Sequence, residues 1–238
     1  LKLLSNNSWM KIGKTLPNYG YKIDDHTSFI RGGNVRRLHG LSKGGMPFNP
    51  FIELPGLIEI GYNINDNIDI TLDIANSFIT AEESEYGYYE TIKEKNISTK
   101  IDFTNIIFNY INLQSSFSFM KESKFQMAGI SGGFSINGIT FMSEIDKAIN
   151  YPNHETVIAI YNELTYNLFQ GIYIIGKHDY FDPNIDFLNG SINRFTLGFE
   201  MFPLNVLEIK IQTRISSIEL DNKTNNDIEY LLQMHTWF

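Results

Sequence analysis

The side chains that most often carry catalysis form at most one short motif in this sequence. Residues 129–133 spell Gly-Ile-Ser-Gly-Gly, which fits the bare spacing Gly-x-Ser-x-Gly of the turn that presents a serine nucleophile, but they lie inside an expected strand, 125–136. We interpret this stretch as a strand that contains flexible glycines. A serine–histidine pair such as Ser131 and His235 stays open as an alternative, although nothing else in the sequence singles it out. We therefore expect a protein that is not an enzyme.

Metal and cofactor chemistry also lacks support. The chain contains no cysteine, which excludes disulfides, thiolate metal sites and covalent haem attachment. Its five histidines are scattered without the spacing of metal ligands, and no glycine-rich phosphate or dinucleotide loop is present. The formal net charge of −8 argues against a nucleic-acid partner. We expect no cofactor, no metal and no nucleic acid.

The charged side chains instead occupy every second position of apolar segments. Between residues 207 and 217, Leu207, Ile209 and Ile211 alternate with Glu208 and Lys210. A period of two predicts a β-strand, because successive side chains of a strand point to opposite faces. The same alternation is found from 68 to 75 and from 139 to 146. No apolar run approaches the roughly 18 residues that a membrane helix needs, so any membrane crossing must use strands.

The whole chain can be divided into such strands. We expect them at about 8–14, 53–62, 67–78, 98–109, 113–122, 125–136, 139–147, 156–167, 170–181, 192–202, 206–218 and 227–238. Short connections at 63–66, 110–112, 137–138, 168–169 and 203–205 alternate with long ones at 15–52, 79–97, 148–155, 182–191 and 219–226, and only 123–124 breaks the order. Outer-membrane barrels sort their turns and loops in this way. The sequence therefore predicts an all-β fold, an antiparallel transmembrane β-barrel, as a single domain over 1–238.

Aromatic residues gather near the ends of these strands. Tyr62, Tyr110, Tyr166, Phe169 and Phe202 lie at the short-turn ends, and Phe78, Tyr180 and Phe181 lie at the long-loop ends. Two aromatic belts at the membrane interfaces would produce this distribution. We therefore expect lipid to surround the barrel.

A membrane barrel must turn its apolar face to lipid and its charged face to the lumen, the reverse of a soluble sandwich. The expected lumen acids are Glu53, Glu59, Asp69, Asp73, Asp102, Glu122, Glu144, Asp146, Glu163, Asp179, Glu200, Glu208, Asp227 and Glu229, and the expected bases are Lys11, Lys100, Lys177, Arg194, Lys210 and Arg214. Acids exceed bases by about two to one. Either these charges pair into ladders across strands, or a net negative lumen favours cations.

Residues 15–52 cannot form wall, because prolines and glycines interrupt any strand there. They carry a basic run that includes Arg31, Arg36, Arg37 and His39. A loop of this length either caps the external mouth or folds inward as a constriction. Its arginines then either bind anions or face acids in the pore, or they pair locally with Asp24 and Asp25; we leave these alternatives open.

Several segments resemble known outer-membrane proteins. Residues 9–14, followed by Pro17 and Tyr19-Gly20, resemble the first strand and loop of phosphate-selective-type porins, and 179–184 and 194–198 are similar to the last hairpins of those porins. The last strand, with Tyr230 on its apolar face and Phe238 at its end, resembles the C-terminal signature that the barrel-assembly machinery reads. The lysine-rich lumen of a phosphate channel is missing. Residues 24–26 and the arginine run faintly resemble barrels encoded beside multihaem cytochromes.

These observations predict a porin in the bacterial outer membrane that lets small solutes or ions diffuse passively. The alternative is a non-conducting sleeve or anchor for a partner, such as a multihaem cytochrome or a surface appendage; a homo-oligomer is also compatible with the sequence. Counting strands back from Phe238 leaves Leu1–Leu4 as the tail of a further strand. Since single-chain bacterial barrels have even strand numbers, we expect more wall upstream and pairing of Leu1–Leu4 with the strand near Trp9. Direct pairing of the 8–14 strand with the last strand would contradict this.

Overall fold

A computed structural model describes residues 7–21, 28–31, 45–46, 54–77, 95–108, 110–151, 155–187, 189–220 and 223–237. This part of the chain holds twelve strands and one short 3-10 helix. The predicted all-β antiparallel architecture is therefore confirmed. Across these ranges, no helix is both long enough and apolar enough to cross a membrane.

Each predicted strand is present, with bounds that differ by at most four residues. In chain order the elements are β1 (Ser8–Lys14), η1 (Phe29–Arg31), β2 (Gly56–Asn65), β3 (Ile68–Asn76), β4 (Lys95–Ile107), β5 (Ile111–Glu122), β6 (Phe125–Ile136), β7 (Ile139–Ile149), β8 (Thr156–Phe169), β9 (Ile172–Asp182), β10 (Ile192–Leu204), β11 (Leu207–Leu220) and β12 (Lys223–Thr236). Most strands have 11 to 14 residues, longer than the five or six residues usual in globular proteins.

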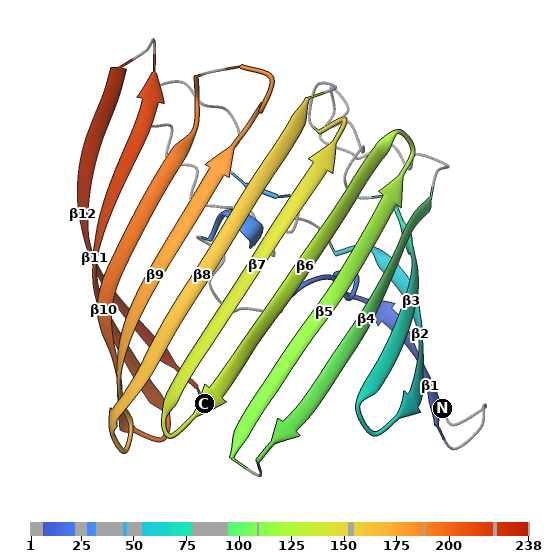
Figure 1. Ribbon diagram of the computed structural model, residues 1–238, viewed down its shortest axis with the longest axis horizontal. Coiled ribbons are helices and arrows are strands. Elements are labelled where there is room, and N and C mark those ends of the chain that lie inside the picture. Colours follow the sequence, from blue (N-terminus) through green and yellow to red (C-terminus); the bar gives the residue numbers. More distant parts are fainter. Residues whose placement is uncertain are drawn as a thin grey trace.

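Every strand pairs antiparallel with its neighbours in the sequence, in the order β1 to β12. Figure 1 shows the strands following one another around a curved wall, with η1 on the concave side behind β8 and β9. Within the described residues β1 pairs with β2 and β12 with β11, and no pairing joins β1 to β12. The predicted contacts of Leu1–Leu4, as well as Phe238, lie outside the described residues.

Two of the short turns lie at other positions than the sequence predicts. Asn137 and Gly138 form the predicted two-residue turn, and both have a positive φ, 48° and 81°. The turn predicted at 168–169 is wrong, because β8 continues through Phe169 and the chain reverses at 170–171, where Gly171 adopts a φ of 77°. The turn predicted at 203–205 is also misplaced: a register shift after Met201 extends β10 to Leu204.

The two faces of the wall have opposite chemistry. Ile58, Leu72 and Ile74 on the convex face are each more than 40% exposed, whereas Glu59 and Asp73 between them are 2% and 0% exposed. A soluble sandwich would show the reverse, with its apolar face buried. The polar face points inward, as the alternation predicts, and the outer face carries exposed isoleucine, leucine or phenylalanine side chains along eleven of the twelve strands, all but β9.

One apolar cluster lies on the inner side, at the long-loop half of the wall. It combines Tyr19, Phe29, Ile30 and Met46, from the long connection between β1 and β2, with inward residues Met120, Phe125, Met127, Ala148, Val157, Ala159, Tyr161 and Phe181 of β5 to β9. The sequence predicts Phe181 in the external aromatic belt, and this prediction is wrong, because Phe181 lies in the inner cluster. Its side chain is 2% exposed and packs on Phe29, with ring centroids 5.5 Å apart.

The other aromatic residues at the strand ends lie on the outer side or near the turns. Tyr62, Tyr110, Tyr166 and Phe169 are each 44% to 65% exposed near the short turns. Tyr180 lies on the outward face of β9, and Phe78 lies outside the described residues.

Candidate channel lumen and its constriction

The register of the strands places the predicted lumen residues on one face. Glu59 lies opposite Asp73, Glu144 opposite Tyr161, and Asp179 opposite Arg194, all on the concave side. The same face holds the other described candidates: Lys11, Asp69, Lys100, Asp102, Glu122, Asp146, Glu163, Lys177, Glu200, Glu208, Lys210, Arg214, Asp227 and Glu229. Glu53 lies outside the described residues.

Many of these charges form ion pairs along the wall, four between neighbouring strands and two, Lys100–Asp102 and Lys210–Glu208, within one strand. The nitrogen–oxygen distances are 2.9 Å for Lys11–Glu59, 2.9 Å for Lys100–Asp102, 3.4 Å for Lys177–Glu163, 3.1 Å for Arg194–Asp179, and 3.0 Å from Lys210 to both Glu200 and Glu208. Cross-strand pairs of opposite charge stabilise a sheet and its register. The wall therefore contains the ladders of paired charges that the sequence left open as one alternative.

The stretch from 15 to 21 crosses the concave side and gives its backbone donors to the wall. The amide of Asn18 donates to Asp73 Oδ2 at 2.7 Å, and the amide of Tyr21 donates to Glu144 Oε2 at 2.6 Å. Between them, the amide of Gly20 donates to the Ser118 hydroxyl at 3.0 Å. We call residues 15–21, 28–31 and 45–46 the inner segment. Three of its backbone amides are satisfied by side chains of β3, β5 and β7 rather than by a strand ladder of its own.

Tyr19 adds a side-chain contact to the same wall. Its hydroxyl donates to Asp146 Oδ1 at 3.1 Å, and the residue is 2% exposed. Burial, together with the nearby carboxylates of Asp146 and Glu144, raises the pKa of Tyr19 well above its ordinary value. The phenol therefore stays protonated, and a hydrogen-bond donor, at every physiological pH.

Arg31 in η1 joins the inner segment to the acids of β7. Its Nη2 lies 2.9 Å and 3.0 Å from the two carboxylate oxygens of Glu144, and its Nη1 lies 3.9 Å from Asp146. The guanidinium also donates to the carbonyl oxygens of Tyr21 and Ile30. Arg31 thus faces lumen acids, whereas the other candidates of the basic run, Arg36, Arg37 and His39, lie outside the described residues.

η1 and the adjoining residues are also held by β9 and β10. The Ser28 hydroxyl donates to Asp179 Oδ1 at 2.8 Å. Arg194, which pairs with the same carboxylate, lies over the ring of Phe29 at 4.3 Å. The inner segment therefore contacts the concave wall from β3 round to β10.

Small residues make this close approach feasible. A Cβ atom at Gly129 would overlap the Asp146 carboxylate and come within 2.7 Å of the Tyr19 hydroxyl. Gly20 has a φ of 53°, and a Cβ there would overlap Glu144. The inward positions 129, 131 and 133 of β6 are Gly, Ser and Gly. This run of small residues on a lumen face was the signal in the sequence that marks where the inner segment docks.

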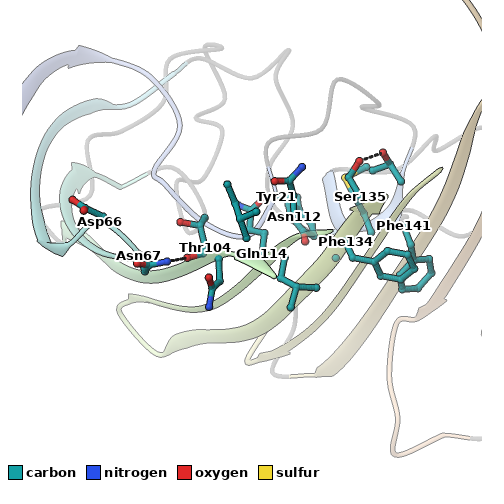
Figure 2. Close-up of a pocket in the computed structure, with 15 residues that line it drawn as sticks. Tyr21, Asp66, Asn67, Thr104, Asn112, Gln114, Phe134, Ser135 and Phe141 are labelled. Carbon is teal, nitrogen blue, oxygen red and sulfur yellow. Dashed lines mark hydrogen bonds between the residues drawn. The ribbon is translucent and has the colours of Figure 1, made fainter. Parts of the chain in front are cut away.

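A cavity of about 620 Å³ lies on the short-turn side of the inner segment. Its inward lining is mostly uncharged and polar, with Thr104, Asn112, Gln114, Ser135 and Thr140 from β4 to β7. Figure 2 shows Tyr21 of the inner segment among these amides and hydroxyls. We call this cavity the vestibule.

Tyr21 closes the vestibule on the side of the inner segment. Its side chain is 8% exposed, and its hydroxyl has no hydrogen-bond partner among the described residues. Burial and the carboxylates of Glu144 and Asp102 raise the pKa of Tyr21 to about 12. The vestibule can therefore offer a neutral phenol, amides and hydroxyls to a small polar solute.

The structure does not assemble the catalytic pair that the sequence left open. Ser131 on β6 shares a hydrogen bond with Ser116, and His235 on β12 lies 2.6 Å from Glu208. No group of three or more potential metal ligands forms within the described residues.

The comparisons with known proteins bear on the fold. No family model matches the chain, and no curated protein does. The solved structure of Pseudomonas putida OprB at high pH is similar over 99% of this chain and 71% of its own, with a TM-score of 0.69 and 9% sequence identity. A bacterial polysaccharide outer-membrane secretin is similar over 77% of this chain and 70% of its own, with a TM-score of 0.44 and 10% identity. At 9% identity, the likeness to OprB shows that the two chains share a fold.

Proposed function

We propose that this chain forms the wall of a bacterial outer-membrane channel through which small polar solutes and ions diffuse passively. The observation that carries the proposal is the polarity of the wall: exposed apolar side chains outside, and buried charges and amides inside. Only helices and closed barrels satisfy their backbone groups in hydrocarbon. The fold shared with OprB, an outer-membrane porin, supports this location.

The inner segment would set the conductance of such a channel. It lies across the concave side at the level of Asp73, Glu144 and Asp179, and the vestibule lies below it. Solutes that pass the inner segment then meet uncharged donors and acceptors. A loop that folds into the lumen narrows the passage without closing the wall around it.

The lumen carries a net acidic balance even with its ion pairs formed. Asp69, Asp227 and Glu229 also face inward, and the inward acids of the described residues outnumber the inward bases even when Arg31 of the inner segment is added. We infer a weak preference for cations, because paired charges cancel over short distances and only the excess acts at long range. The same balance gives no support for the phosphate-selective type.

Planar-bilayer recording tests the proposal. The purified chain, reconstituted in a lipid bilayer, should give stepwise ohmic openings. Under a gradient of potassium chloride, the reversal potential should take the sign of a cation-preferring pore. A sheet that never inserts, or a barrel that inserts without conducting, would contradict the proposed channel.

One observation favours a second candidate, a non-conducting sleeve or anchor. The inner segment and its apolar cluster fill part of the lumen at the long-loop half. A barrel plugged in this way would hold a partner rather than pass solutes. Copurification of a partner with a silent barrel would support the sleeve, whereas conductance from the purified chain alone supports the channel.

The assembly signal stays a prediction. Tyr230 lies on the outward face of β12 and is 82% exposed, while Phe238 lies outside the described residues. We propose that this strand is read by the barrel-assembly machinery. Substituting Tyr230 by Ser should lower the amount of barrel in the outer membrane without changing the conductance of the molecules that insert.

A further inference from the structure

A groove of about 670 Å³ interrupts the outward face of β7 to β11. Its floor is Gly176 of β9, where a Cβ atom would meet only the backbone oxygen of Leu164, at 4.0 Å. Leu164, Phe195 and Leu197 form its apolar sides and are 51%, 56% and 65% exposed. Clefts that hold small ligands usually measure roughly 300–1,000 Å³, so the groove has the size of a binding site.

A row of hydrogen-bonded polar side chains crosses the same outward face beside the groove. The Ser143 hydroxyl donates to Asn162 Oδ1 at 2.8 Å, the Asn162 amide lies 3.2 Å from His178 Nδ1, and His178 Nε2 lies 2.9 Å from Asn193 Oδ1. This pattern fits a neutral imidazole that accepts at Nδ1 and donates from Nε2. Polar groups on a lipid-facing wall are costly unless they are paired, and here each finds a neighbour.

The outward side chains of β9 change character along the strand. From the long-loop end they are Asp182, Tyr180, His178, Gly176 and Ile174. Charged and aromatic residues are typical of the headgroup level of a membrane, and apolar residues are typical of its hydrocarbon. The order along β9 therefore matches the order of groups along one lipid molecule, from the headgroup through the linkage to the acyl chain.

We infer that the groove binds the acyl chain of a membrane lipid from the leaflet on the long-loop side, with the linkage oxygens of that lipid beside Asn162 and His178. Asn162 has two N–H donors and gives one to His178, so its carboxamide can donate the other to an ester oxygen. The inference rests on the lipid-facing wall of the proposed function.

The preference of the groove over the surrounding bilayer comes from packing and hydrogen bonding. Hydrocarbon is as apolar as leucine, so burial of apolar surface adds little to association inside a membrane. An acyl chain in the groove gains dispersion contacts on three sides and a hydrogen bond at its linkage. A hydrogen bond in a membrane changes a binding equilibrium by about threefold, and this sets the size of the effect to be measured.

The test uses photolabelling in vesicles. The full chain is reconstituted in dimyristoyl phosphatidylcholine vesicles that contain phosphatidylcholine with a diazirine in the middle of one acyl chain. After illumination, labelled peptides are quantified for the wild type, Gly176→Leu and Gly132→Leu. Gly176→Leu fills the groove, and Gly132→Leu is the matched control, because Gly132 is an outward glycine of β6 whose Cβ would also meet only ordinary contacts, at 3.5 Å and beyond. Heat-modifiable migration on gels confirms that each variant is folded.

We expect labelling of β8 to β10 to exceed that of β5 and β6 about threefold in the wild type, and to fall to the level of β5 and β6 in Gly176→Leu but not in Gly132→Leu. Equal labelling around the wall, unchanged by Gly176→Leu, would overturn the groove while leaving the membrane wall in place. Absence of label from every outward face would overturn the proposed function itself. Cross-links between two copies of the chain that disappear in Gly176→Leu would replace the lipid by a second copy and also overturn the inference.

Discussion

Replacing Arg31 by Ala should release the inner segment from the lumen wall. The guanidinium contacts both carboxylate oxygens of Glu144 at 2.9 Å and 3.0 Å, and Glu144 is 1% exposed. Removing one partner of a buried ion pair costs about 3–5 kcal/mol, because the remaining charge is left uncompensated. In the displaced state, lumen water solvates the Glu144 carboxylate. The uncompensated charge of the variant therefore destabilises only the seated state, and the whole cost shifts the equilibrium between the seated and displaced states.

A cost of that size changes the ratio of seated to displaced molecules by roughly 10² to 4 × 10³. We expect the lower end, because the amide of Tyr21 still donates to Glu144 in the variant. In planar bilayers, Arg31→Ala should therefore show a higher mean conductance and frequent transitions between two conductance levels. Arg31→Lys should lie between the wild type and Arg31→Ala, because an ammonium cannot reproduce the planar fork of the guanidinium.

The control must change the lumen charge equally without touching the inner segment. Lys100→Ala meets this need, since Lys100 pairs with Asp102 on its own strand at 2.9 Å and is 7% exposed. It should change ion preference but leave the conductance levels unchanged. Identical recordings from Arg31→Ala and Lys100→Ala would refute the reasoning, because they would show that Arg31 acts only through its charge.

Gly20→Ala should also unseat the inner segment, since its Cβ would overlap Glu144 at a φ of 53°, and overpacking of this kind costs about 1–3 kcal/mol; single-channel conductance measures it, and wild-type levels would contradict it. Glu229→Gln and Asp227→Asn together should weaken the cation preference without changing the conductance levels, which the reversal potential in a salt gradient records; an unchanged potential would locate the preference elsewhere. Ile130→Lys places a charge on an outward side chain that is 65% exposed and should destabilise the barrel in vesicles by about 2–4 kcal/mol. Gln114→Lys, in the vestibule, should change the resistance to denaturant little, and equal losses of stability in the two variants would mean that the convex face does not contact lipid. The pKa of Tyr21 is raised from 10.0 to about 12 in the seated state, so the seated state holds the phenol proton more tightly than the displaced state. Seating should therefore be fully stable below pH 10 and should weaken as the pH rises from 10 toward 12, which would raise the conductance. Tyr21→Phe should lessen this alkaline rise in conductance, and an equal rise in both proteins would assign it to other groups.

Alternation was sufficient to predict the wall. Glu208, Lys210 and Arg214 alternate with isoleucines over a length that few soluble strands reach, so strand type, face and pairing order all follow from one local pattern. The turn at 137–138 was equally local, because Asn and Gly can both adopt positive φ. Where the turn depends on a single glycine, at Gly171, the alternation predicts it two residues too early.

The constriction could not be predicted in the same way. The inward positions Met127, Ala148 and Val157 are apolar because they pack against the inner segment, and this erases the contrast between the two faces at the long-loop end. Arg31 could pair with Asp24, Asp25 or any lumen acid as far as the sequence shows, and only the curvature of the wall brings it to Glu144. The local pattern likewise predicts Phe181 at the lipid interface, because its inward neighbour Phe29 is distant in the sequence and leaves no local signal.

The neighbour-only pairing of the strands has a consequence for the order in which the molecule forms. Apart from the pairing of β1 with β2 across the long connection, each hairpin joins residues that are closer in the chain, so the wall can grow one strand at a time at a small entropic cost for each closure. The contacts of the inner segment are different, because they join residues 113, 127 and 151 positions apart. Their partners on β7 and β9 exist as a surface only after those strands have paired. The inner segment must therefore seat last, and every newly made molecule passes through a stage in which its wall is built and its constriction is not.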